Sequence, residues 1–452
     1  MPDVRTHAAQ RLRMYLIYSL LLVLTAVVAS PWFAWQALRH RKYVGSVRER
    51  LGRLPVSLNL DAEPSIWVHA VSVGEVLAAR PLVESLKVRY PGLRLFVSTT
   101  TIAGQQMARG IQDADGVFYF PFDFAFVVRR VLDVLRPRLF VMVESEIWPN
   151  LLRECRRRQV KIAVVNGRIS RRSYPRYRLA RPFFRRVLAP IDRFCMQSDE
   201  SARRIIELGA DPARVSVTGS LKFDAAALPT LSRGRDRVLR FFRVSPARQV
   251  IVAGSTMRGE DLPVLRAFRR VKTAAPGALL LLAPRHAQRF EEAMHLARGE
   301  GFSTVRRSAL PIDVEPRADV VIVDTMGELA QLYQLATVAF VGGSLVGTGG
   351  HNILEPAVFG RPIVFGPCMH NFAEIAREFL AHNAAVQVQS ERELEGVLVS
   401  LLMDPVRRAG LGAAAKALVE ANRGARDRTM EAIGRLVPPG RPATIHPFRV
   451  VH

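Results

Sequence analysis

Residues 66–79 read IWVHAVSVGEVLAA, and this stretch indicates the fold class of the chain. Residues 66–70 form an apolar run with β-branched and aromatic side chains, which is typical of a buried strand. Residues 71–75 then form a turn, and residues 76–79 begin a helix. A strand that leads through a short turn into a helix is the repeating unit of parallel α/β sheets. The stretch therefore predicts an α/β protein.

The same alternation continues along the chain in two series. The first series predicts strands at residues 66–70, 94–98, 117–120, 139–143, 162–165 and 215–218. The second predicts strands at residues 250–253, 278–283, 318–323, 338–341, 362–365 and 385–388. Residues 224–236 contain three consecutive alanines, a proline and a glycine, and read as a linker between the series. We expect two doubly wound, Rossmann-like domains that face each other across a cleft.

Composition sets the limits of this organisation. The chain has 452 residues, of which 49% are hydrophobic and 23% charged, enough for roughly two or three packed domains. Its 3 cysteines form no CxxC pair, which argues against a disulfide framework or a zinc site and fits a reducing compartment. We divide the chain into a membrane helix (1–36), a first domain (37–235), a second domain (236–437) and an irregular tail (438–452).

The charge balance is strongly basic. Lys and Arg total 65 against 40 Asp and Glu, a net charge of +25. Such an excess favours polyanionic partners, which are nucleic acid, anionic lipid surfaces or acidic substrates. A basic membrane protein that tethers nucleic acid would carry clustered basic and aromatic residues. Because the arginines are instead spread over both halves, we expect no nucleic-acid partner.

Residues 14–35, MYLIYSLLLVLTAVVASPWFAW, contain no charged residue. A helix of this length rises ~1.5 Å per residue and roughly spans a ~30 Å hydrocarbon core. The run ends in Pro31, Trp32 and Phe33 rather than in a small-residue cleavage site, so we favour an uncleaved anchor over a cleaved signal peptide. A helix that lies in the membrane interface is the alternative. More cations follow the segment than precede it, which favours a cytoplasmic body at an anionic leaflet.

Polar residues follow the predicted strands of the first half, where open parallel sheets bind their ligands. Glu75 lies in the first turn of a helix, where a carboxylate interacts favourably with the helix dipole. That interaction explains the residue structurally, and we also expect it to keep the carboxylate ionised, as a general base must be. Glu144 and Glu146 follow the fourth predicted strand. Lys222, one of only 6 lysines, follows the sixth, where a solvated surface role is equally plausible.

The second half carries more such residues after its strands. Ser255 follows the first of them, and Pro284 and Arg285 follow the second. The glycine-rich residues 342–350, with Gly347 among them, lead into a helix and resemble a phosphate-binding cradle, although neither GxGxxG nor a Walker motif occurs. A merely flexible loop is the alternative. Glu355 beyond the loop is a candidate acceptor for ribose hydroxyls.

Seven sequence strings, which follow the predicted strands or overlap their ends, carry a family resemblance. They are HAVSVGE (69–75), VESEIWPN (143–150), NGRIS (166–170), GSLKFD (219–224), APRH (283–286), DTMGEL (324–329) and GGSLVGTGGHNILEPA (342–357). In this order, after an apolar N-terminal segment, they resemble the bacterial Kdo (3-deoxy-D-manno-octulosonic acid) transferase family of lipopolysaccharide synthesis, over residues 14–430. The resemblance implies a GT-B fold and an inverting glycosyltransferase that needs neither metal nor cofactor. The implied reaction moves Kdo from CMP-Kdo onto a lipid A precursor (lipid IVA) at the cytoplasmic face of the inner membrane.

The resemblance also implies roles for individual residues. Glu75 matches the catalytic base, in a domain that binds the acceptor. In a second, CMP-sugar-binding domain, the positions that match CMP-binding segments are Pro284, Arg285, Thr325, Met326, Gly327, Glu328, Asn352, Ile353, Leu354 and Glu355. We add Glu144, Glu146, Lys222, Ser255 and Gly347 as possible substrate-binding residues. The alternative function is a GT-B transferase that uses another nucleotide sugar, such as a UDP-hexose, on a lipid-linked acceptor.

Overall fold

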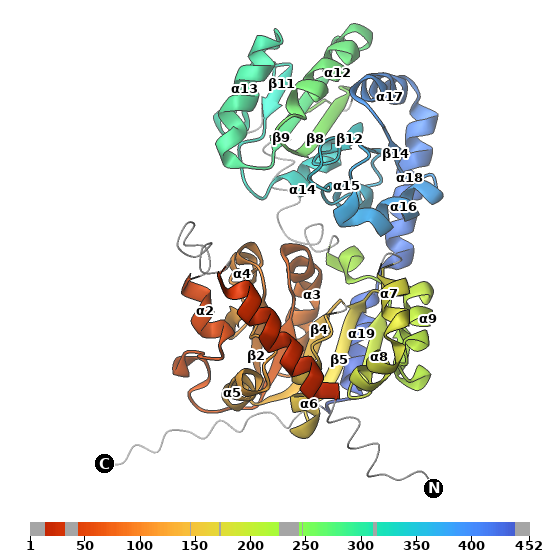
Figure 1. Cartoon of the computed structure of the whole chain (residues 1–452). Coiled ribbons are helices and arrows are strands. Elements are labelled where there is room, and N and C mark those ends of the chain that lie inside the picture. The colour runs from red at the N-terminus through yellow and green to blue at the C-terminus, as the bar shows by residue number, and fades with distance from the viewer. Residues whose placement is uncertain are drawn as a thin grey trace, which may run out of the picture. The chain divides into compact units, whose positions relative to one another are not determined.

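The computed structural model describes residues 14–31, 44–144, 146–170, 173–225, 244–245, 247–310 and 314–438. The chain forms two compact units (Figure 1). The first comprises Met1–Ala225 and Gly424–His452, and the second comprises Ala226–Arg423. Each unit is built on its own seven-stranded sheet, and every strand pairing in both sheets is parallel. The predicted α/β class is confirmed.

The first sheet has the order β3-β2-β1-β4-β5-β6-β7. Its strands are β1 (Ser65–His69), β2 (Arg94–Thr99), β3 (Gly116–Tyr119), β4 (Pro137–Val143), β5 (Lys161–Gly167), β6 (Arg193–Met196) and β7 (Val215–Val217). The strand order reverses between β1 and β4, where His69 lies beside Met142. The carboxyl ends of β1 and β4 therefore form the switch point, the position at which doubly wound sheets bind ligands.

Helices cover both faces of this sheet, so both faces of β1 are buried. Trp67 belongs to one apolar cluster, with Phe140 of β4, and Val68 belongs to another, with Val141. The helices of the unit are α2 (Val44–Arg50), α3 (Val73–Arg89), α4 (Ile102–Ala108), α5 (Ala125–Leu135), α6 (Pro149–Arg157), α7 (Tyr174–Leu179), α8 (Arg181–Leu188) and α9 (Asp199–Glu207), with short 3₁₀ turns η1 (Val56–Asn59) and η2 (Pro212–Arg214).

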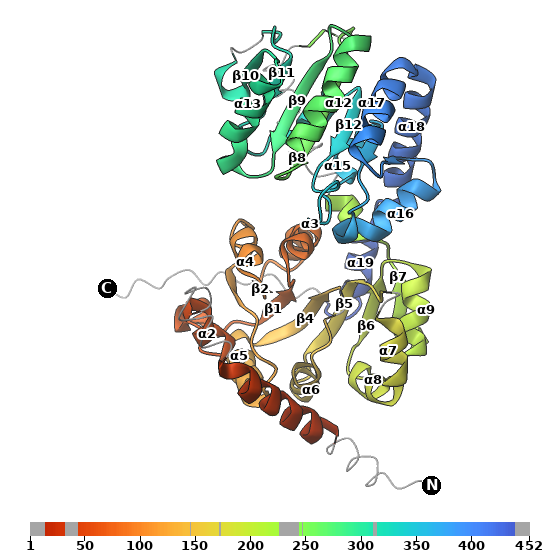
Figure 2. The ribbon, with the colours of Figure 1, turned by 45° about the horizontal axis from the view of Figure 1, so that its top comes forward.

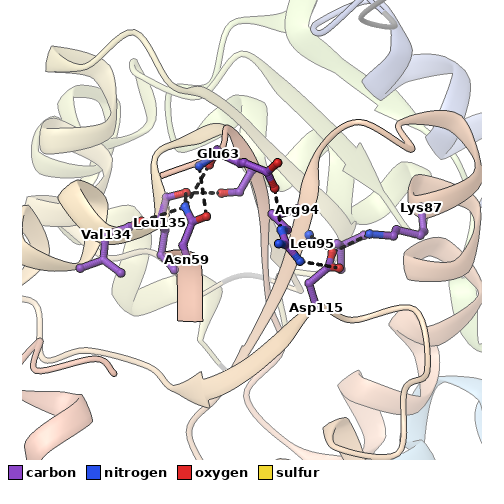
Figure 3. A network of polar contacts seen from close by, with 9 residues as sticks. Asn59, Glu63, Lys87, Arg94, Leu95, Asp115, Val134 and Leu135 are labelled. Carbon is purple, nitrogen blue, oxygen red and sulfur yellow. Dashed lines mark hydrogen bonds and ion pairs between the residues drawn. The ribbon is translucent and has the colours of Figure 1, made fainter. Parts of the chain in front are cut away.

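A polar network closes the amino-terminal edge of this sheet, away from the switch point (Figure 3). The Asn59 amide donates to the carbonyl oxygens of Glu63 and Val134, at 2.9 and 3.0 Å, and so joins the segment before β1 to the end of α5. Asp115 accepts from the Leu95 backbone N–H at 2.7 Å and pairs with Lys87 at 2.6 Å. These bonds satisfy backbone groups at the strand ends and are structural.

The second sheet has the order β10-β11-β9-β8-β12-β13-β14. Its strands are β8 (Val250–Thr256), β9 (Leu279–Pro284), β10 (Thr304–Arg306), β11 (Val320–Ile322), β12 (Val338–Val341), β13 (Ile363–Phe365) and β14 (Val386–Gln387). The helices of this unit are α12 (Asp261–Ala274), α13 (Phe290–Gly299), α14 (Leu329–Leu332), α15 (Leu354–Val358), α16 (Ala373–Ala381), α17 (Glu391–Met403) and α18 (Pro405–Asn422), and its 3₁₀ turns are η3 (Ala287–Arg289), η4 (Arg307–Ala309), η5 (Tyr333–Leu335) and η6 (His370–Phe372). Strands β11, β9, β8 and β12 are consecutive neighbours, so their carboxyl ends lie side by side.

The last described helix, α19 (Ala425–Gly434), belongs to the first unit. The sequence analysis placed these residues in the second domain, because nothing in their pattern marks a return of the chain. In the structure Ala425 and Ile433 are buried in the same apolar cluster as Val68. Asp224 holds the start of the helix by accepting from the backbone N–H groups of Gly424 and Arg426, at 2.9 and 2.6 Å. Most of the expected linker 224–236, and residues 439–452 of the expected tail, lie outside the described residues.

The N-terminal helix (Met14–Pro31) is long and apolar enough to cross a membrane, with a mean hydropathy of 2.0. Only 6% of this helix is buried. It lies across the first unit and begins beside α6 (Figures 1 and 2). Tyr15 is buried against the unit, whereas apolar side chains on other faces of the helix, such as Leu20 and Leu24, are exposed. Trp32 and Trp35, which we expect to lie at the membrane interface because aromatic residues gather there, fall outside the described residues.

Candidate functional site

Glu75 lies in the first turn of α3, directly after β1. Ser72 is the N-cap residue of this helix, but its side chain makes no capping bond there. Glu75 instead reaches back, and its carboxylate accepts from the Val71 backbone N–H at 2.8 Å and from the Ser72 hydroxyl at 3.1 Å. Such backward bonds hold a first-turn carboxylate in a fixed orientation. The side chain is half-buried at the switch point of the sheet.

Burial raises the pKa of the Glu75 carboxyl to about 7, and the negative charge of Glu144 and, less strongly, that of Glu146 add to the rise. The hydrogen bonds from Val71 and Ser72 oppose it. The sequence predicts that the helix dipole keeps this carboxylate ionised, and burial and the neighbouring carboxylates act against that effect. A pKa near the working pH suits a general base.

The structure brings the other predicted residues of the first unit to the same place. Glu144 follows β4 with a left-handed backbone (φ 61°). Its carboxylate lies 3.3 Å from the Lys222 ammonium group, so both side chains are half-buried as a pair rather than solvated separately. Glu146 is also half-buried, and burial followed by the Glu144 charge raises the pKa of its carboxyl. Three carboxylates and one ammonium group thus share the ends of β1, β4 and β7.

Arg285 marks the corresponding edge of the second sheet. It directly follows Pro284, the last residue of β9, and its backbone N–H donates to the Thr256 carbonyl at 3.0 Å. Arg285 is exposed. Its positive charge acts to lower the pKa of His351, and it acts in the same direction on Glu355, where the larger effect of burial opposes it. Burial, the larger cause for His351, brings its pKa to about 4, so the imidazole is neutral. Arg285 and Glu355, which are 70 positions apart in the sequence, therefore belong to one cluster of ionisable groups.

Glu355 lies in the first turn of α15. Burial raises the pKa of its carboxyl to about 7, although the Asn352 amide and Arg285 act in the opposite direction. The Asn352 amide donates to Glu355 at 3.3 Å, and its oxygen accepts from the Leu354 backbone N–H at 3.1 Å. Ile353 and Leu354 are fully buried. These two apolar residues therefore pack in the core and support Asn352 and Glu355 on either side of them.

The segment Thr325–Glu328 follows β11, the neighbour of β9. The Thr325 hydroxyl donates to Glu328 at 2.7 Å, and the same carboxylate lies 3.4 Å from the Arg307 guanidinium group. Met326 is 73% exposed, so its side chain is free to contact a ligand. Gly327 has a φ of 87°, a backbone conformation that strongly favours glycine.

The glycine-rich residues 342–350 are held by a residue that the sequence analysis missed. Glu260 is fully buried, and its carboxylate accepts from the backbone N–H groups of Gly343, Ser344 and Leu345, at 2.5, 2.9 and 2.8 Å. It also accepts from the Met257 N–H at 2.8 Å. The N–H groups at the start of the loop are thus already hydrogen-bonded to the Glu260 carboxylate and are not available to a phosphate. The prediction that the loop binds phosphate is therefore wrong for these residues.

Ser255 and Gly347 differ in how closely the chain surrounds them. Ser255 has a left-handed backbone (φ 56°), and a Cβ atom at Gly342 would lie 2.6 Å from its carbonyl oxygen. Glycine at 342 therefore allows the loop to pass directly over the end of β8. Gly347 is exposed and has open space around it. The loop thus has a tightly packed beginning and an open middle.

The described residues contain no group of three or more His, Cys, Asp or Glu side chains placed to hold a metal ion.

Glu260 was missed because it lies six residues beyond Gly254, within a helix start that reads as an ordinary acidic first turn. Its signal in the sequence is a glutamate directly before α12. Nothing local shows that this glutamate meets a loop more than 80 residues away.

Comparison with solved structures identifies the fold of the two units. The UDP-GlcNAc 2-epimerase of Neisseria meningitidis, solved with UDP-GlcNAc, superposes with a TM-score of 0.56 at 11% identity, over 82% of this chain and all of that one. The two parallel seven-stranded units are therefore those of the GT-B fold, found in nucleotide-sugar glycosyltransferases and epimerases. At 11% identity this likeness defines the fold alone.

Sequence comparison is more specific. The model of the family described as "3-Deoxy-D-manno-octulosonic-acid transferase (kdotransferase)" matches residues 45–225. The 3-deoxy-D-manno-octulosonic acid transferase of Bordetella pertussis is 36% identical over 397 residues, which cover 85% of this chain and 90% of that protein. The transferase of the same name from Haemophilus influenzae is 35% identical over 369 residues, 81% of this chain and 86% of that protein. The chain belongs to the 3-deoxy-D-manno-octulosonic acid transferase family.

Proposed function

We propose that this protein transfers Kdo from CMP-Kdo to a lipid A precursor, with inversion at the anomeric carbon and with Glu75 as general base. Family membership supports the substrates. The observation that carries the mechanism is the half-buried Glu75 carboxylate, oriented by Val71 and Ser72, whose pKa is raised to about 7. Such a group is substantially ionised at neutral pH and is basic enough to take a proton from an attacking hydroxyl.

In the proposed reaction a hydroxyl group of the acceptor gives its proton to Glu75, and its oxygen attacks the anomeric carbon of Kdo. The bond from that carbon to the phosphate oxygen breaks, and CMP leaves with the electron pair. Attack from the side opposite the leaving group inverts the configuration. Arg285, whose guanidinium group is exposed, would neutralise the charge that develops on the CMP phosphate.

The second unit would hold the nucleotide. Pro284 ends β9 and Arg285 follows it. The segment from Thr325 to Glu328 follows β11, and the residues from Asn352 to Glu355 follow the glycine-rich loop. Glu355 would accept from ribose hydroxyls, and the exposed Met326 would pack against the nucleoside. Because the first N–H groups of the loop are paired with Glu260, its open middle at Gly347 is the part left to approach the sugar.

Glu144, Glu146 and Lys222 would contact the substrates on the side of the base. The Lys222 ammonium group lies 3.3 Å from the Glu144 carboxylate and suits the carboxylate of Kdo or an acceptor phosphate. The Glu144 charge that it partly offsets is also the charge that raises the pKa of Glu75. A bound anion at Lys222 would therefore act on the base through this pair.

The N-terminal helix would confine the enzyme to the membrane that carries its lipid acceptor. The exposed apolar side chains of this helix fit either a spanning anchor or a helix lying in the interface. The net charge of +25 favours the anionic cytoplasmic leaflet, where each nearby cation adds about 1 kcal/mol of attraction. We therefore place the protein at the cytoplasmic face of the bacterial inner membrane.

Supplying single donors tests this function. Purified full-length protein in detergent, given a lipid A precursor, should transfer from CMP-Kdo and not from UDP-sugars, and EDTA should leave the rate unchanged. Transfer from a UDP-sugar alone would favour the alternative, a GT-B transferase with another donor. Strict dependence on added Mg²⁺ would contradict the metal-independent mechanism.

A further inference from the structure

One face of the N-terminal helix makes polar contacts with the first unit. The Tyr18 hydroxyl donates to Asp123 at 3.0 Å, and the Ser19 hydroxyl lies 3.2 Å from the Asn150 amide nitrogen, which donates to it. The Arg153 guanidinium group lies 4.9 Å from the centre of the Tyr15 ring. An anchor needs no such groups, because a membrane helix is held by its apolar surface alone.

The two hydrogen-bond partners of the helix, Asp123 and Asn150, meet at the start of α6. Asp123, on the loop before α5, is 2% exposed, and its carboxylate accepts from the backbone N–H groups of Asn150 and Leu151 at 2.9 and 2.7 Å. These are the first free N–H groups of α6, since Pro149 has none. The N-cap residue Trp148 provides no capping bond of its own. Asp123 therefore supplies from another segment the cap that this helix lacks.

The start of α6 in turn lies close in sequence to Glu146, one of the carboxylates that act on Glu75. Glu144 directly follows β4 and Trp148 directly precedes α6, so these two residues mark the ends of the connection. At one end the Glu144 N–H donates to the Val165 carbonyl at 2.9 Å, and at the other the Trp148 ring packs against Phe120 with ring centres 5.3 Å apart. Glu146 lies two residues from Trp148, so a shift of the helix start moves its carboxylate relative to Glu75.

We infer that the N-terminal helix is a positioning element for the transfer reaction as well as a membrane anchor. Tyr18 and Ser19 clamp Asp123 and Asn150, this clamp holds the start of α6, and the start of α6 places the Glu146 carboxylate relative to the base. Tyr18, Ser19 and Asp123 are thus positioning residues. The expected effect on the rate of transfer rests on the proposed role of Glu75. The hydrogen bonds between the helix and the first unit do not depend on that role.

The helix contains its own matched controls. Thr25 and Ser30 also carry hydroxyl groups, but these donate to the backbone carbonyls of Leu21 and Val27 within the helix and are exposed. Ser30→Ala and Thr25→Val therefore remove a hydroxyl from the same apolar helix without touching the first unit. Ser19→Ala and Tyr18→Phe remove a hydroxyl from the clamp, and all four changes keep or raise the apolar character of the helix.

Hydrogen exchange tests the clamp without any assay of activity. In full-length protein in detergent, the amides of Asn150 and Leu151 should exchange about three- to tenfold faster in Tyr18→Phe than in wild type, because Asp123 loses a donor that orients it. Asp123→Asn, which replaces one acceptor oxygen by a donor, should increase exchange further. Unchanged exchange at these two amides in both variants would overturn the inference, whether or not the protein transfers Kdo.

Rate measurements on detergent-solubilised acceptor test the effect on catalysis, because the rate then does not depend on attachment of the enzyme to a membrane. Tyr18→Phe and Ser19→Ala should lower kcat about three- to tenfold, since small displacements of catalytic groups reduce rates strongly. The affinity for CMP and the unfolding midpoint should match those of Ser30→Ala and Thr25→Val. Equal kcat in all four variants would refute the positioning role, and a parallel loss of CMP affinity would show general destabilisation instead. Absence of Kdo transfer by the wild-type protein would count against the proposed function alone.

Discussion

Replacing Glu75 by glutamine should make the protein more stable and nearly inactive at the same time. Glutamine has the shape of glutamate and can still accept from the Val71 N–H, but it can neither ionise nor take up a proton. General-base catalysis typically contributes about 10²–10⁴-fold. We therefore expect the rate of transfer to fall by about that factor, while CMP, bound through the second unit, binds as in wild type.

The gain in stability follows from the raised pKa. A carboxyl whose pKa rises from 4.5 to about 7 on folding holds its proton more tightly in the folded state. Stability is therefore lost as the pH rises from about 4.5 to 7, by about 3 kcal/mol in total for Glu75. Glu75→Gln avoids this loss. It should unfold at a higher temperature than wild type at pH 8 and at nearly the same temperature at pH 4.5.

Transfer assays and thermal unfolding of both proteins at several pH values check this prediction. The wild-type rate at saturating substrate should rise with pH to half its maximum near pH 7, since only the ionised base is active. Glu84→Gln is the matched control, because Glu84 lies on the same helix and pairs with Arg80 at 3.1 Å, away from the switch point. Near-normal turnover of Glu75→Gln, or a stability difference that does not grow with pH, would refute the reasoning.

Four further substitutions test the remaining groups. Glu144→Gln removes the negative charge that contributes to the raised pKa of Glu75, so the acidic limb of the pH–rate profile should move to lower pH; a shift to higher pH would contradict the assignment. Arg285→Ala and Glu355→Ala should each weaken CMP binding in isothermal titration by about tenfold or more, and unchanged affinity in both would place the nucleotide elsewhere. Glu260→Gln puts an amide N–H against the N–H groups of the glycine-rich loop and should likewise weaken CMP binding, through the loop rather than by contact; equal affinity would show that the loop needs no anion to keep its shape.

Much of the fold was readable from the sequence because most strands are long apolar runs. Two strands escaped. The four residues of β6, RFCM, include Arg193, and β10 has only the three residues TVR. The apolar part of β6 is only Phe194, Cys195 and Met196, and β10 contains a single apolar residue, so neither strand gives a local pattern that predicts it. The return of α19 to the first unit escaped for a related reason, because Asp224 and the buried Ile433 meet only in three dimensions.

The candidate site was predictable in its residues and not in its electrostatics. Polar residues after strand ends identified Glu75 and Arg285, since the carboxyl ends of parallel strands meet at one edge. The pKa of Glu75 depends on burial and on Glu144, which lies 69 residues away in the sequence. Glu260 escaped because three of its four donors become its neighbours only when the glycine-rich loop folds over β8. Long-range desolvation and pairing of this kind are properties of the folded chain.

Mass spectrometry of the reaction product tests the central claim most directly. Purified full-length protein in detergent is incubated with CMP-Kdo and a lipid A precursor, beside a sample of Glu75→Gln. The account predicts that wild type converts the lipid to a species heavier by one or more Kdo residues and releases CMP, and that the variant leaves nearly all of the lipid unchanged. An unmodified lipid with the wild-type protein, or equal conversion by the variant, would contradict it.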